Sequence, residues 1–290
     1  MRWVDYESPS TVQEAISLLG GDRKAKMLAG GTDVLVQLRA GRGDTNLIVD
    51  VKGIPELNEM RLDPQQGLTL GAAVPCYKIY GDAEIQKAYP GLIDCASLIG
   101  GIQIQGRASI GGNLCNSAPS ADAIPMLIAC GVTCKIASAD GTREVAAEDI
   151  CTGPGQNVLR AGELLVSMHF SLPKANSGAR YIRFIPRNEM DIAVAGSGVN
   201  VTLENGTFKT ARIALASVAP TPLFVREAGE ALTGQPVNDE SIAKAAALAK
   251  AAASPITDMR GTIEYRKHLC EVLTRRALND AVKRARGEQV

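Results

Sequence analysis

The sequence RASIGGNLCNSAPSADAIP, residues 107–125, holds the most distinctive pattern in this chain. Near its start, two glycines stand between small polar side chains. Because glycine has no Cβ, the backbone N–H groups of such a turn can come close to a bound anion. The stretch therefore predicts a phosphate-binding loop, made of Ser109, Ile110, Gly111, Gly112 and Asn113.

A second glycine pair in similar surroundings lies near the N-terminus, in the sequence KMLAGGTD. Its residues are Lys26, Met27, Leu28, Ala29, Gly30, Gly31, Thr32 and Asp33. A short strand leads into the glycines, and Thr32 or Asp33 can cap the apolar helix that follows. The N–H groups and the dipole at the start of that helix favour an anion. Two phosphate-binding loops in one chain indicate a dinucleotide.

A Gly-Gly pair taken alone is more often an ordinary tight turn. The chain has no G-x-G-x-x-G that opens a helix after a strand and no G-x-x-x-x-G-K-[ST], so the residues predict neither a Rossmann turn nor a P-loop. What the residues support without further comparison is a soluble chain with two glycine-rich turns that can bind anions.

Length and composition limit the class of protein. A chain of 290 residues, 46% hydrophobic and 21% charged, predicts about two globular domains. Equal numbers of basic and acidic residues, 31 of each, give no indication of a nucleic-acid or anionic-membrane partner. No secretory signal pattern or membrane span is evident, so we expect a cytoplasmic protein. Seven scattered cysteines without a C-x-x-C predict free thiols.

The order of helix and strand patterns predicts an α+β fold. Helices are expected at 10–19, from Pro75 towards Lys87, over 92–99 and 122–129, and at 224–232, 239–253 and 262–285. Strands are expected at 26–28, 46–51, 67–72, 132–138, 144–146, 164–172, 180–186, 192–203 and 209–218. The polar break PKANSG, residues 173–178, is the expected domain boundary.

The chain offers little material for acid–base or metal chemistry. Its two histidines, His169 in a strand pattern and His268 on a basic helical face, have no cysteine or carboxylate at the spacing of metal ligands. A structural role is expected for both. Such a chain fits a protein whose cofactor performs the chemistry.

Three segments resemble the FAD-binding medium subunits of the molybdenum hydroxylases, the family of bacterial xanthine dehydrogenase and carbon monoxide dehydrogenase. They are LAGGTDVLVQLR, RASIGGNLCNSAPSADAIP, and PITDMRG at 255–261 with Glu264-Tyr265-Arg266. The resemblance implies a two-lobed FAD-binding domain of the vanillyl-alcohol-oxidase (PCMH) type at 1–174, with lobes at about 1–57 and 58–174. It also implies a C-terminal domain at 175–290, in which a small antiparallel sheet is covered by helices.

The same resemblance implies roles for individual residues. Both glycine loops would hold the FAD pyrophosphate, and Ile99 would contact the adenine. Asp122 would accept hydrogen bonds from FAD hydroxyls, although it can also serve as a helix N-cap. Leu165 would make a backbone contact near the flavin. Arg183 would lie near the flavin pyrimidine, its alternative being a solvated arginine at a strand edge.

The family further implies partners and a reaction. A large subunit binds the molybdopterin cofactor and hydroxylates the substrate, and a small subunit carries two two-iron two-sulfur clusters. FAD then passes electrons to NAD, a quinone, oxygen or another acceptor, in a complex expected to be a dimer of heterotrimers. After the glycines of the first loop, this chain has Thr32 and Asp33 where carbon monoxide dehydrogenases usually carry a histidine and a serine. This difference favours a heterocycle, purine or aldehyde as substrate. A carbon monoxide dehydrogenase medium subunit, a stand-alone flavin oxidoreductase and a subunit that has lost its flavin remain alternatives.

Overall fold

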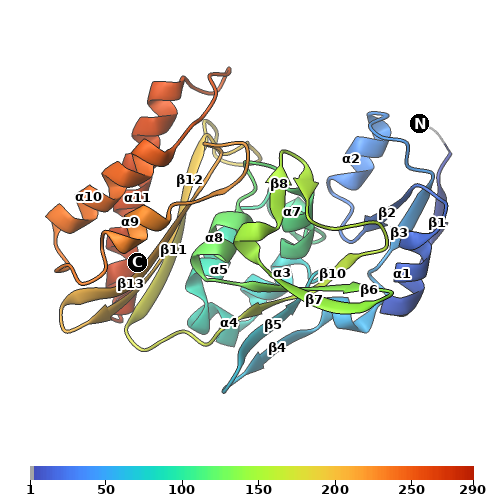
Figure 1. Cartoon of the computed structure of the whole chain (residues 1–290), viewed down its shortest axis with the longest axis horizontal. Coiled ribbons are helices and arrows are strands. Elements are labelled where there is room, and N and C mark those ends of the chain that lie inside the picture. Colours follow the sequence, from blue (N-terminus) through green and yellow to red (C-terminus); the bar gives the residue numbers. More distant parts are fainter. Residues whose placement is uncertain (1–2) are drawn as a thin grey trace.

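The computed structural model describes residues 3–290 and contains three main sheets, which follow one another along the molecule (Figure 1). Each has its own apolar core. The N-terminal sheet lies at one end, the middle sheet with its helices at the centre, and the C-terminal sheet with three helices at the other end (Figure 1). The predicted α+β class is therefore confirmed. No helix within residues 3–290 is both long enough and apolar enough to span a bilayer.

The N-terminal sheet is parallel, with the order β1 (Asp5–Glu7), β3 (Leu47–Asp50) and β2 (Ala25–Leu28). Helix α1 (Val12–Gly20) starts two residues later than the expected helix at 10–19, because the capping box is formed by Thr11 and Glu14. The short α2 (Val34–Arg39) follows the first glycine loop, and a 3₁₀ turn, η1 (Pro55–Asn58), leads to the middle sheet.

The middle sheet is antiparallel, in the order β4 (Met60–Asp63), β5 (Gly67–Gly71), β10 (Leu164–Phe170), β6 (Thr133–Ser138) and β7 (Gly141–Ala146). Its helices are α3 (Cys76–Gly81), α4 (Ala83–Ala88), α5 (Pro90–Ala96), α6 (Ile102–Gln105), α7 (Ile110–Asn116) and α8 (Ala123–Ala129). A turn, η2 (Ala147–Asp149), and a small hairpin of β8 (Cys151–Gly153) and β9 (Gln156–Asn157) precede β10.

Two helix predictions in this region were too long. The single helix expected from Pro75 towards Lys87 is divided at Asp82, whose extended backbone ends α3 and whose carboxylate accepts from the N–H groups of Glu84 and Ile85 to cap α4. The helix expected at 92–99 ends at Ala96, before Gly100 takes a left-handed conformation with φ of 61°. A local cap and a local turn therefore override the apolar spacing.

The C-terminal sheet is antiparallel, with the order β11 (Ser177–Phe184), β12 (Ala195–Glu204), β13 (Thr207–Ala216) and β14 (Leu223–Phe224). Helices α9 (Arg226–Glu230), α10 (Asp239–Ala252) and α11 (Ile263–Ala285) belong to the same part of the chain. Strand β11 begins inside the polar break at 173–178. Glycine is required there, because a Cβ on Gly178 would lie 2.1 Å from the carbonyl oxygen of Ala281 in α11.

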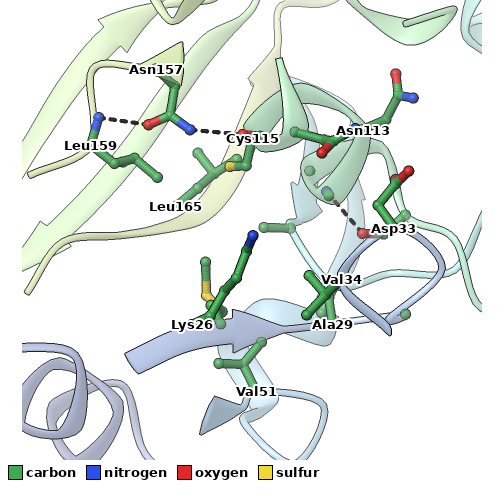
Figure 2. Close-up of a pocket in the computed structure, with 18 of the residues that line it drawn as sticks. Lys26, Ala29, Asp33, Val34, Val51, Asn113, Cys115, Asn157, Leu159 and Leu165 are labelled. Carbon is green, nitrogen blue, oxygen red and sulfur yellow. Dashed lines mark hydrogen bonds between the residues drawn. The ribbon is translucent and has the colours of Figure 1, made fainter. Parts of the chain in front are cut away.

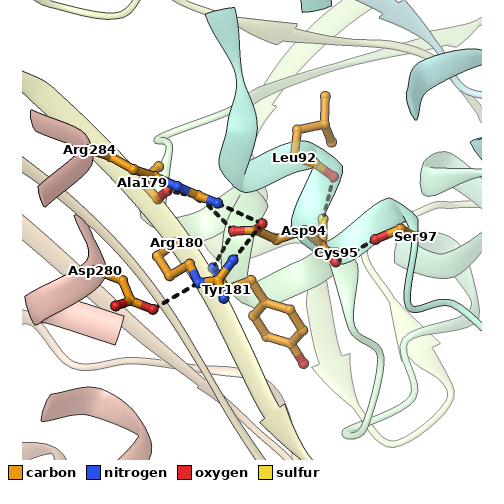
Figure 3. A network of polar contacts seen from close by, with 9 residues as sticks. All are labelled: Leu92, Asp94, Cys95, Ser97, Ala179, Arg180, Tyr181, Asp280 and Arg284. Atoms are coloured by element: carbon orange, nitrogen blue, oxygen red, sulfur yellow. Dashed lines mark hydrogen bonds and ion pairs between the residues drawn. The ribbon is translucent and has the colours of Figure 1, made fainter. Parts of the chain in front are cut away.

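A buried carboxylate joins the middle sheet's helices to the C-terminal sheet (Figure 3). Asp94 on α5 pairs with Arg180 of β11 at 2.8 Å and with Arg284 of α11 at 2.6 Å. It also accepts from the backbone N–H of Tyr181. The Asp94 side chain is only 11% exposed and supplies the counter-charge of Arg284, whereas Arg180 also pairs with Asp280 at 3.2 Å. This one residue therefore connects three elements that are far apart in the sequence.

We predict that Asp94→Asn lowers the free energy of unfolding by about 3 kcal/mol, because it leaves the largely buried Arg284 without its carboxylate and removes one of the two carboxylates that pair with Arg180. Asp280→Asn is the matched control, since Asp280 pairs only with Arg180 and is more exposed. It should cost less than about 1 kcal/mol. Urea unfolding of the two variants checks this, and equal losses would contradict the role given to Asp94.

Candidate functional site

Both predicted glycine loops line one cavity of about 430 Å³ (Figure 2). Strand β2, the start of α2, helix α7, the β8–β9 hairpin and the start of β10 all contribute to its wall. The predicted site residues that line it are Lys26, Met27, Ala29, Gly30, Gly31, Thr32, Asp33, Ile99, Ser109, Gly111, Gly112, Asn113 and Leu165. The structure thus brings together residues from positions 26 to 165.

The two loops touch one another through their backbones. A Cβ on Gly30 would lie 2.0 Å from the carbonyl oxygen of Arg107, and the Arg107 Nε donates to the carbonyl of Gly30 at 2.9 Å. Gly31 has φ of 79°, a conformation that side chains rarely adopt. The first loop therefore needs one glycine for close packing and the other for its turn.

The two glycines of the second loop also have different roles. Ser109 caps α7 by accepting from the N–H of Gly112 at 3.0 Å. A Cβ on Gly111 would lie 2.5 Å from the carbonyl oxygen of Ala72, so this glycine is needed for packing. A Cβ on Gly112 would meet only the Ser109 hydroxyl, at 3.1 Å. Because Gly112 lines the cavity, its missing side chain leaves room for a ligand.

The donors at the first loop suit a phosphate. The backbone N–H groups of residues 30–33 donate to no group within residues 3–290. Such unpaired N–H groups beside a cavity are the arrangement by which backbone turns bind anions. The remaining wall is largely apolar, with Leu19, Val51, Leu57 and Ile99 among its side chains. The residues present therefore fit a ligand that has both a phosphate group and flat apolar parts.

Several polar residues of the wall had no signal in the sequence. Lys26 donates to Gln37 of α2, and Gln37 donates to Asn116 of α7 at 3.2 Å. Asn157 holds the hairpin by donating to the carbonyl of Cys115 at 2.7 Å and accepting from the N–H of Leu159 at 2.9 Å (Figure 2). Only the helical spacing of Gln37, three residues after Val34, could have placed it on the cavity side of α2.

Two titratable groups of the cavity wall are held in fixed states, whereas burial raises the pKa of a third, Asp33. Hydrogen bonds from Arg143 hold the pKa of Glu163 at about 2. Burial raises the pKa of the Cys115 thiol to about 12. Neither group exchanges a proton near neutral pH. Within residues 3–290 no cluster of three or more histidine, cysteine or acidic side chains could hold a metal, and neither histidine lines the cavity.

Four predicted site residues lie outside the cavity wall. Leu28 and Ile110 are buried in the fold, 6% and 1% exposed. Asp122 and Arg183 pair with one another at 2.5 Å, and Tyr181 donates to the same carboxylate at 2.9 Å. Their predicted contacts with the cofactor therefore stay predictions.

The structure contradicts the alternative roles given to Asp122 and Arg183, a helix N-cap and a solvated arginine. Arg183 is no solvated arginine, because its side chain is only 6% exposed. Asp122 precedes α8 but makes no side-chain capping bond; the N–H of Ala123 donates to Asn113 instead. Burial raises the pKa of Asp122 to about 6, against the opposing effects of Arg183 and Tyr181. Long-range pairing across 61 positions gives no sequence signal.

Comparisons with known proteins agree along the whole chain. Residues 2–174 match the family described as FAD binding domain in molybdopterin dehydrogenase, and residues 180–281 match the CO dehydrogenase flavoprotein C-terminal domain. The xanthine dehydrogenase FAD-binding subunit of Escherichia coli O157:H7 is 33% identical over 99% of this chain and 98% of its own length. The carbon monoxide dehydrogenase medium chain of Afipia carboxidovorans is 32% identical over 98% of each chain.

Solved structures give the same result. Carbon monoxide dehydrogenase from Hydrogenophaga pseudoflava has a chain similar to this one with a TM-score of 0.93 and 30% identity, covering 98% of both chains. Quinoline 2-oxidoreductase from Pseudomonas putida 86 has a chain with a TM-score of 0.90 and 27% identity, covering 98% of this chain and 99% of its own.

We predict that Gly112→Ala binds FAD at least about tenfold more weakly, because its methyl group enters the cavity beside the loop donors. The variant should nevertheless fold, and α7 should gain roughly 0.5–1 kcal/mol from replacing a helical glycine. Flavin bound per purified chain and thermal unfolding without flavin check the two parts. Full flavin occupancy in the folded variant would remove Gly112 from the site.

Proposed function

This chain belongs to the family of FAD-binding subunits of the molybdenum hydroxylases, and we propose that it carries electrons between two partners. It takes them from the iron–sulfur clusters of a small subunit and passes them to an external acceptor such as NAD or a quinone. A large molybdenum subunit supplies them by hydroxylating a heterocycle, purine or aldehyde. We place this heterotrimer in the cytoplasm, paired with a second copy.

The observation that carries the proposal is the single cavity built from both glycine loops. The unpaired N–H groups of residues 30–33 and the space beside Gly112 would hold the FAD pyrophosphate, and Ile99 and Leu165 belong to the apolar wall. When bound, FAD supplies a centre that accepts electrons and releases them one or two at a time. The chain's own residues position that centre and exclude water from part of it.

The cavity supports electron transfer better than a stand-alone substrate reaction. A flavin enzyme that oxidises its own substrate needs a group that moves a proton beside the ring. Glu163 is held ionised by Arg143, the Cys115 thiol is held protonated by burial, and neither His169 nor His268 lines the wall. Burial raises the pKa of Asp33, but this carboxyl group belongs to the loop that we assign to the pyrophosphate. An electron-transfer subunit has no need of such a group.

We further propose a division into an FAD-binding domain at 1–174, with lobes at about 1–57 and 58–174, and a C-terminal domain at 175–290. The first division falls between the parallel and the antiparallel sheets, beside η1. The second falls between β10 and β11. Both lobes of the first domain then contribute to the cavity, since β2 of one lobe and α7 of the other line it.

We predict that the isolated chain loaded with FAD is not reduced by xanthine, quinoline or an aldehyde, because Glu163 and Cys115 exchange no proton near neutral pH and no histidine lines the cavity. The same flavin should be reduced when the chain is assembled with its molybdenum and iron–sulfur partners. Anaerobic flavin absorbance after mixing with each substrate measures this, and dithionite, which needs no partner, is the control. Reduction of the isolated chain by a substrate at a catalytic rate would favour the stand-alone enzyme.

A further inference from the structure

The cavity wall carries a half-buried lysine that lacks a carboxylate partner. Lys26 stands on β2, four residues before Gly30, and its side chain rises from the strand into the cavity (Figure 2). Within residues 3–290 its ammonium forms no ion pair and donates only to the side-chain oxygen of Gln37. Asp33, on the same wall, has a pKa that burial raises and the charge of Lys26 lowers. A cation partly removed from water is costly without a counter-charge, which an anionic ligand would supply.

Lys26 sets the direction of a short series of hydrogen bonds. An ammonium can only donate, so the side-chain oxygen of Gln37 faces Lys26 and its amide N–H faces Asn116. Asn116 accepts that bond through its side-chain oxygen at 3.2 Å. Its own amide N–H groups donate to no group in the described part of the chain. We call Lys26, Gln37 and Asn116 the relay; its free hydrogen-bonding groups are all donors.

The relay lies beside both glycine loops. Its three residues line the same cavity as the loops do. Asn116 follows Gly112 by four residues on α7, so both lie on one face of that helix. Gln37 bridges β2 of the N-terminal sheet and α7 of the second loop. The cavity therefore has two separate sets of donors: backbone N–H groups in the loops, and side chains with a positive charge in the relay.

We propose that the relay is a second phosphate site, which makes the cavity select a diphosphate over a single phosphate; this rests on the function proposed above. Phosphate oxygens accept hydrogen bonds, and each phosphorus of a dinucleotide carries a negative charge. One phosphate meets the backbone donors of the loops, and the other meets Lys26 and Asn116. Hydrogen bonds assisted by charge are roughly twice as strong as neutral ones, so the second phosphate adds substantially to binding.

Lys26→Met tests the proposal, because it removes the charge and keeps an apolar side chain of similar length. We expect FAD to bind the flavin-free chain about tenfold or more weakly, and FMN, with its single phosphate, to bind as before. Lys26→Arg keeps the charge and should retain FAD affinity to within about threefold. Lys24→Met is the matched control, since Lys24 pairs with Asp44 at 2.9 Å and does not line the cavity. Calorimetric titration measures all four chains.

Gln37→Glu separates the charge of Lys26 from the mechanical connection between α2 and β2. The new carboxylate keeps the contact with Lys26 and neutralises its charge. We expect FAD affinity to fall about tenfold or more, while the thermal unfolding midpoint of the flavin-free chain is not lowered. A relay that only connects α2 to β2 would keep its FAD affinity in this variant.

The outcomes that contradict the proposal are specific. Unchanged FAD affinity in Lys26→Met or Gln37→Glu would show that the relay binds no phosphate. Equal losses for FAD and FMN in Lys26→Met would show that the relay does not distinguish a diphosphate from a single phosphate. In both cases the unmodified chain still binds FAD, so the proposed function stands. If the unmodified chain bound no FAD at all, the proposed function and the relay site would both be wrong.

Discussion

The close backbone contact between the two glycine loops is the constraint on which the site depends. Gly30 lies against the carbonyl of Arg107, and Gly111 lies against Ala72, at distances that leave no room for a side chain. The first contact joins the loop after β2 of the N-terminal sheet to the second glycine loop, and the second contact packs α7 against Ala72, directly after β5 of the middle sheet. The other glycine of each pair, Gly31 or Gly112, then remains available for the turn and for the ligand. The cavity that we propose as the dinucleotide site is thus a consequence of how the two loops pack.

The position of the C-terminal sheet depends on a second constraint, a pair of buried carboxylates. Asp94 and Asp122 stand on different helices of the middle sheet, and both bind residues of β11. Asp122 also adjoins the cavity through the bond between Ala123 and Asn113. The strand that starts the C-terminal sheet is therefore connected to the second glycine loop by a short series of hydrogen bonds. Buried pairs of this kind fix relative orientation more than they add stability.

The sequence predicted the local features well. Both glycine loops, most strands and the long C-terminal helices follow from short-range patterns, since periodicity and turn residues act over a few positions. Strand β4 and the β8–β9 hairpin escaped prediction because they are short and their pairing depends on neighbours far along the chain. The Asp122–Arg183 pair and the contacts of Gln37 and Asn157 escaped for the same reason. Side chains that come into contact only in the folded chain produce no periodic pattern in the sequence.

The most direct test of the central claim compares flavins that differ only in the phosphate and adenosine groups attached to the ribityl chain. FAD, FMN and riboflavin can each be titrated calorimetrically into the flavin-free chain. If both glycine loops hold a pyrophosphate and the apolar wall receives the adenosine, FAD should bind at least about 100-fold more tightly than FMN, a difference of about 3 kcal/mol. Equal affinities for FAD and FMN would show that the two loops do not form one dinucleotide site.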